Sequence, residues 1–212
     1  MQHDVFGDHV SRDLCALAVS SPTSKLGLTE QDLLDRSLLG DPEIVPGEKR
    51  VMVPEGETAR IVMAREMRKT FKDTYDLDLS HLSDAEVIDS LKYNIFPNLF
   101  IYGGPGLPQI QQARPLGNDV NRCTLDVIVF RPLKPGEEPD PAQVYRITEA
   151  NSYKEVTGVS EFMGNVLDQD TQILAWQHEG MQASEKGHET LARYQESRIR
   201  RVHETMDKYL NR

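Results

Sequence analysis

At 212 residues the chain has room for one well-packed domain, and we expect a single domain over residues 1–212. Its formal net charge of −10 opposes binding to phosphate backbones, which draws its affinity from lysine and arginine, so no nucleic-acid partner is expected. The sequence has neither a signal-peptide pattern nor an apolar run of roughly 18 residues, which predicts a cytoplasmic protein with no membrane partner.

The N-terminal part of the chain is predicted to be irregular at first and then helical. Thr29 with Asp32, and Ser83 with Glu86, have the spacing of residues that cap helix N-termini. A loop rich in proline, glycine and charge separates the first two helices. The expected elements are a short strand Leu14–Val19, helix Thr29–Leu39, loop Asp41–Gly56, helix Glu57–Tyr75 and helix Asp84–Lys92.

From Tyr93 onward, β-branched and aromatic residues gather in short runs separated by glycine and proline, a pattern typical of antiparallel strands. The cluster Gly103-Gly-Pro-Gly106 suggests either a phosphate loop or a turn. No helix start follows it, which favours the turn. The predicted strands are Asn94–Tyr102, Gln109–Leu116, Cys123–Pro132 and Gln143–Ala150.

Two helices are expected to end the chain, Val159–Met181 and Thr190–Leu210. The second has a stripe of apolar residues that we expect to pack: Ile199, Val202, Met206 and Tyr209. The whole pattern predicts an α+β fold.

Asp170 is the most informative residue of the first of these helices. At about 100° per residue it falls in the middle of an apolar face, whereas Asp168 points to the opposite side. A carboxylate on a buried stripe needs a compensating partner. The residues predicted to share that face are Val159, Phe162, Met163, Val166, Ile173, Leu174 and Met181.

Three explanations for Asp170 stay open from the pattern alone. The first is a salt bridge to an arginine of the sheet such as Arg114, Arg122 or Arg146, and the second is a bent helix that exposes the site to water. The third is a catalytic or metal-binding role. Gln177 lies on the same face. It would either orient such a carboxylate or bond a buried backbone carbonyl.

Two segments resemble a known family. The segment from Tyr93 to Phe100, Tyr-Asn-Ile-Phe-Pro-Asn-Leu-Phe, is similar to a strand segment of the large subunit of Rieske non-haem iron aromatic-ring-hydroxylating oxygenases. The segment from Val166 to Gly180 resembles the helix that carries their iron carboxylate. Arg114–Gly117 and Tyr194–Arg200 also fit.

The resemblance implies a helix-grip fold of the START-like kind, in which a curved antiparallel sheet wraps a long C-terminal helix around an apolar cavity. It implies that Asp170 is a ligand of mononuclear Fe(II), with Asp168 as the fallback ligand, beside two histidines. Phe96, Asn98, Phe162 and Val166 are then candidate substrate contacts, although such residues are also ordinary core.

The resemblance also implies parts that this sequence does not display. The family's 2Fe-2S cluster is bound by two cysteines and two histidines in an N-terminal domain. Cys15 and Cys123 lie in no such motif, and His3 and His9 have the wrong spacing for one helix face. We therefore expect an N-terminally truncated catalytic domain that lacks the cluster domain and is inactive alone.

Two functions of different classes remain at this point. The first is the catalytic portion of an oxygenase of aromatic hydrocarbon catabolism, which hydroxylates an aromatic or related apolar compound with dioxygen. When complete, it would receive electrons from a ferredoxin or reductase and form a homotrimer. The alternative is a non-catalytic helix-grip protein that binds an apolar small molecule without a metal.

Overall fold

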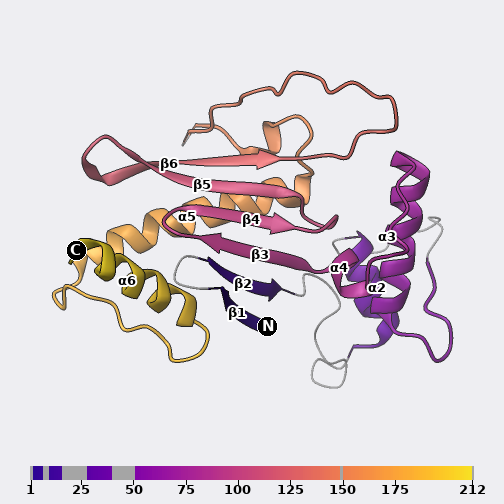
Figure 1. Cartoon of the computed structure of the whole chain (residues 1–212), viewed down its shortest axis with the longest axis horizontal. Coiled ribbons are helices and arrows are strands. Elements are labelled where there is room, and N and C mark those ends of the chain that lie inside the picture. Colours follow the sequence, from indigo (N-terminus) through magenta and orange to yellow (C-terminus); the bar gives the residue numbers. More distant parts are fainter. Residues whose placement is uncertain (1, 7–9, 16–27, 40–50, 149, 212) are drawn as a thin grey trace. The chain divides into compact units, whose positions relative to one another are not determined.

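The computed structural model describes residues 2–6, 10–15, 28–39, 51–148 and 150–211 (Figure 1). The chain divides into two compact units, Met1–Glu138 with Arg200–Arg212, and Pro139–Ile199. The first unit contains a sheet and helices in separate segments of the chain, so the predicted α+β class is confirmed.

The first unit contains a six-stranded antiparallel sheet. Its strands lie in chain order, so each pairs with its sequence neighbour (Figure 1). Between the second and third strands, the described residues form three helices. The strands are β1 Gln2–Phe6, β2 Val10–Cys15, β3 Ser90–Ile95, β4 Leu99–Gly103, β5 Gln109–Leu116 and β6 Asp119–Val129.

The predicted strand Asn94–Tyr102 is wrong in one respect, because the chain reverses within it. A turn at residues 96–98 separates β3 from β4, and Ile95 pairs with Leu99 across it. Pro97 has no N–H to donate to a ladder, which favours a turn there. The prediction joined the apolar residues on both sides of Pro97 and Asn98 into one strand and overlooked this turn.

Other strand predictions have mixed outcomes. Strand Gln109–Leu116 is confirmed by β5, and Cys123–Pro132 is confirmed in part by β6. The predicted strand Leu14–Val19 begins within β2, and its last four residues lie outside the described residues. The described residues of Gln143–Ala150 form no strand, because no described strand pairs with them, and Val144 is 86% exposed.

Helices α2 Glu30–Leu39, α3 Ala59–Tyr75 and α4 Asp84–Ile88 pack together in the first unit. The apolar sides of α2 and α3 meet at Leu34 and Val62, which are fully buried. A second cluster joins α3 to α4 around Ala64, Val87 and Ile88. These helices confirm the two longer predicted helices, whereas the third ends at Ile88 and its predicted last residues begin β3.

Local polar contacts position α3 and α4 next to the start of β3. Ser83 and Glu86 form the predicted capping box at the start of α4. Arg60 of α3 binds both carboxylate oxygens of Asp89, at 2.9 and 2.8 Å, immediately before β3. Gly104 lies in the predicted turn between β4 and β5, at a φ of 98°. A Cβ there would lie 3.1 Å from the carbonyl oxygen of Glu86.

The second unit contains the short 3-10 helix η1 Tyr153–Glu155 and the long helix α5 Glu161–Ala183. Ser160 caps α5 by accepting a hydrogen bond from the backbone N–H of Met163, so the helix begins two residues after the predicted start.

The last helix, α6, spans Ser197–Leu210 and begins seven residues later than predicted. Ile199, Met206 and Tyr209 of its predicted packing stripe are more than 40% exposed, and Thr205 is the buried residue. Tyr209 nevertheless packs as predicted, because its ring lies against that of Phe96. Thr205 donates its hydroxyl hydrogen bond to the carbonyl oxygen of Arg201 in its own helix.

Candidate functional site

One face of α5 packs against η1. Gly164 makes this approach possible, because a Cβ there would lie 2.9 Å from backbone atoms of Lys154. Leu167, one turn further along, is only 3% exposed. Asp168 completes the contact through its carboxylate. The buried face of α5 within its unit is therefore the face that turns toward η1.

Asp168 holds the start of η1. One carboxylate oxygen accepts a hydrogen bond from the hydroxyl of Ser152 at 2.5 Å, and the other accepts one from the backbone N–H of Tyr153 at 2.9 Å. The Ser152 hydroxyl, followed by the Tyr153 N–H, lowers the pKa of Asp168 below its usual value. Burial, and secondarily the nearby Asp168 carboxylate, raises the pKa of Tyr153.

Asp170 lies on another side of α5 and is exposed. Its carboxylate forms no hydrogen bond or ion pair with the residues that the structure describes. Arg114, one of the arginines considered for it, instead pairs with Asp126 at 2.7 Å. Asp170 thus presents a carboxylate that no described side chain compensates.

Within the second unit, the first part of the predicted apolar face of α5 is half-buried, and its later part is exposed. Ile173, Leu174 and Met181 are 38%, 56% and 56% exposed. Hydrophobic periodicity identified the helix and its apolar face, but a pattern does not specify what covers that face. Within the second unit, α5 packs closely against η1 on the opposite side of the helix, at Gly164, which has no side chain to keep the two backbones apart.

α5 also carries the predicted site residues Val166, Gln177 and Phe162. Val166 is half-buried, and Gln177 is exposed and two turns beyond Asp170. Gln177 forms no hydrogen bond with the described residues, so neither of its two predicted roles is realised among them. The Phe162 side chain lies outside the part that the structure describes.

The turn between β3 and β4 carries the two predicted site residues of the first unit, Phe96 and Asn98. The ring of Phe96 lies 5.2 Å from that of Tyr209 in α6, measured between centroids. Asn98 donates from its amide nitrogen to the carbonyl oxygen of Ala113 at 2.6 Å, and the N–H of Ala113 donates back to the carbonyl oxygen of Asn98. Asn98 therefore fastens this turn to β5.

The sheet has faces of different chemistry. On what we call the apolar face, the register places Tyr93, Ile101, Ile110 and Ile128 in one cross-strand row. On the opposite face, Lys92, Tyr102 and Gln109 form the corresponding row. Tyr93, Ile101 and Ile110 are half-buried and Ile128 is 50% exposed, so this face offers apolar surface to a ligand and is the candidate ligand surface of this unit.

A row of more polar residues crosses the apolar face near the turn at residues 96–98. It places Gln112 between Leu99 and Asp126. Arg114 lies one position further on the same face and binds Asp126, which raises the pKa of Arg114 through a hydrogen bond and charge attraction. Sequence reasoning missed Gln112. The alternation of side chains along Gln109–Leu116 could have identified it.

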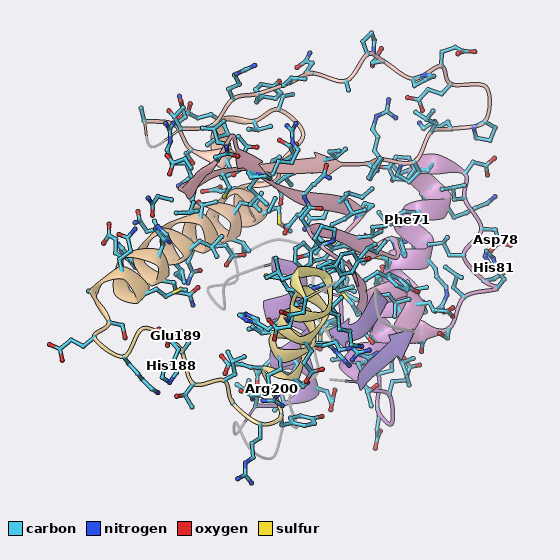
Figure 2. The ribbon with its side chains drawn as sticks, turned by 60° about the vertical axis from the view of Figure 1, so that its left-hand side comes forward. Phe71, Asp78, His81, His188, Glu189 and Arg200 are labelled. Atoms are coloured by element: carbon cyan, nitrogen blue, oxygen red, sulfur yellow. The ribbon has the colours of Figure 1, made fainter. Side chains whose placement is uncertain are left out.

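The described histidines do not gather. His81 lies beside Asp78 in the loop after α3 (Figure 2), where Ser80 first, and His81 to a smaller extent, lowers the pKa of Asp78. His188 lies next to Glu189 in the loop after α5 (Figure 2). Across the described ranges, no three histidine, cysteine or acidic side chains form a group that could hold a metal ion.

An antiparallel sheet with one apolar face, together with a long carboxylate-bearing helix, defines an α+β protein of the helix-grip class. A family model for the ring hydroxylating alpha subunit (catalytic domain) matches residues 41–212. The chain belongs to this family of ring-hydroxylating oxygenase catalytic domains, as its sequence predicts. Comparisons with curated proteins and with solved structures found no match.

Membership of this family indicates the general type of activity, because the family is one of oxidoreductases that depend on non-haem iron. In their complete form, its members act with dioxygen, a substrate and electron-transfer partners, and they are oligomers. Among the helices that the structure describes, none has the length and apolar character needed to cross a bilayer.

Proposed function

We propose that this chain is the substrate-binding and iron-carboxylate portion of an oxygenase that hydroxylates an aromatic or related apolar compound. The match of the family model over residues 41–212 carries this proposal. The apolar sheet face supports it, since aromatic ligands need extended apolar surface.

We propose Asp170 as the iron ligand. Its carboxylate is exposed and has no partner among the described residues, so it can bind a metal without first losing another contact. Asp168 is a poorer ligand, because both of its oxygens already accept hydrogen bonds. This difference favours Asp170 over the fallback ligand.

The described residues supply only part of the donor set for iron. A site with two imidazoles and one carboxylate suits ferrous iron and leaves positions open for dioxygen. Asp170 fits the carboxylate position, but no described group of three ligands completes the site. The proposal therefore assigns one ligand to this chain and leaves the histidines unassigned.

The remaining predicted residues have supporting roles in this proposal. On the family match alone, we propose Phe96, Phe162 and Val166 as apolar contacts of the substrate. Asn98 uses its amide nitrogen in the turn, which leaves its side-chain oxygen for a substrate donor.

The experiment compares Asp170→Ala with Gln169→Ala, a matched control at the adjacent exposed position, in the native oxygenase that contains this chain. We expect Asp170→Ala to lose bound iron, measured by mass spectrometry of the metal, and to lose substrate-dependent oxygen uptake. Gln169→Ala should keep both. Full iron content and full activity in Asp170→Ala would remove the ligand assignment.

A metal-free binder of apolar small molecules makes the opposite prediction. In that case, the native protein would contain no stoichiometric iron and would bind an aromatic probe equally well with or without Asp170.

A further inference from the structure

Gln112 places an amide with unused hydrogen-bonding capacity on the apolar face of the sheet. It is half-buried between Leu99 on β4 and Asp126 on β6. Its amide forms no hydrogen bond within the described part of the chain. Its neighbour Gln111 differs on both counts, since it lies on the opposite face and accepts a hydrogen bond from the hydroxyl of Tyr102 at 3.3 Å.

The surroundings of Gln112 suit a ring with a polar substituent. Ile101 and Ile110, in the next row, offer apolar surface for the ring. Arg114 and Asp126 pair with each other at 2.7 Å, so the adjacent charges are largely compensated and do not select for a strongly charged ligand. A neutral amide that both donates and accepts matches a hydroxyl or carbonyl oxygen.

We propose that Gln112 is a specificity-determining residue that selects oxygen-bearing aromatic compounds over the bare hydrocarbon of the same ring size. This inference rests on the proposed function and names the substrate class for it. A bare ring covering the apolar face would remove water from the amide without replacing its hydrogen bonds, which opposes binding. A hydroxyl on the ring restores one of those bonds.

The test measures the dissociation constants of 1-naphthol and naphthalene for the full chain by equilibrium dialysis. The quantity compared is the ratio of the two constants, because it cancels effects common to both ligands. In Gln112→Leu, we expect 1-naphthol to bind about three- to tenfold more weakly, the change for one lost hydrogen bond, while naphthalene binds at least as tightly as before.

Gln111→Leu is the matched control, because it makes the same chemical change one residue away on the opposite face. It should leave the ratio unchanged. Gln112→Met serves as a second variant that removes the amide and retains an unbranched side chain, should leucine disturb the strand. An unchanged ratio in both Gln112 variants, or the absence of binding by either probe, would overturn the proposal.

The outcome is separable from that of the proposed function. Asp170→Ala tests iron, and dialysis of these probes needs no iron. If iron is retained in Asp170→Ala while Gln112→Leu changes the ratio, the iron assignment fails and the specificity role stands. The reverse result removes the specificity role alone.

Discussion

The ion pair between Arg60 and Asp89 predicts unequal effects when either partner is replaced. Arg60 binds both oxygens of Asp89, but their side chains differ in exposure, at 32% and 3% respectively. Replacing Arg60 leaves a buried carboxylate without its partner, whereas replacing Asp89 leaves a guanidinium that water already reaches. The hydrogen bond to Asp89 raises the pKa of Arg60, so the guanidinium remains charged at ordinary pH.

The expected loss of unfolding free energy depends on how deeply the remaining partner of the ion pair is buried. Removing one partner of a fully buried pair costs about 3–5 kcal/mol of unfolding free energy. Because Arg60 is partly exposed, we expect Arg60→Met to cost about 2–3 kcal/mol, below that range. Asp89→Asn retains a side-chain oxygen for Arg60 and should cost about 1 kcal/mol.

Urea unfolding followed by far-ultraviolet circular dichroism measures both variants, and Arg65→Met serves as the control. Arg65 lies on the same helix and pairs with Glu57 at 3.0 Å, but its side chain is 50% exposed, so its loss should have little effect on stability. Equal costs for Arg60→Met and Asp89→Asn, or a cost for Arg60→Met as small as that of Arg65→Met, would refute the desolvation argument.

Two further predictions concern α5 and the helical core. Ser152→Ala removes the hydrogen bond that contributes most to the lowered pKa of Asp168. It should reduce the thermal midpoint at neutral pH, and the difference from the wild type should become smaller in melts at pH values below the lowered pKa, because a depressed carboxyl pKa stabilises only while the group is ionised. The part of the difference that remains is the loss of the hydrogen bond that the Ser152 hydroxyl accepts from the backbone N–H of Lys154; a difference that does not become smaller would contradict this linkage. Leu34→Ala should cost about 2–5 kcal/mol in urea unfolding because Leu34 is fully buried, and a cost below 1 kcal/mol would show that the cluster collapses around the smaller side chain.

Local signals predicted α2, α3, the start of α4 and the bounds of β5 well. Ser83 with Glu86 predicted the start of α4, and a short run next to glycine and proline residues predicted β5. These features depend on residues a few positions apart. A hydrogen bond between a side chain and a nearby backbone group determines the start of α4, and glycine and proline residues mark the neighbouring turns of β5. One sequence therefore contains this information.

Features that depend on distant partners were not predictable in the same way. The run from Asn94 to Tyr102 is apolar on both sides of the turn, so its periodicity does not mark the reversal, which the bonds between Asn98 and Ala113 hold in place. The predicted strand Gln143–Ala150 has the residues of a strand but no described neighbour to pair with. Strand propensity becomes a strand only when a ladder forms.

The sequence also predicted the candidate site only in part, because helix geometry is local but the partners of each side chain are not. The helical wheel separated Asp168 from Asp170, and the structure places Asp168 against η1 and exposes Asp170. The wheel gave burial as the reason to expect a partner for Asp170, and that reason fails. The proposed role of Asp170 now depends on the family match and on its freedom from local bonds.

Two carboxylates two residues apart on one helix can therefore serve different purposes. A group whose oxygens are occupied by Ser152 and Tyr153 fixes the backbone around it, but it would have to break those bonds to bind a metal. A carboxylate without local hydrogen bonds has none to break, so a bound cation stabilises it more. The bonds of Asp168 thus hold α5 in place against η1, which fixes the backbone from which Asp170 projects.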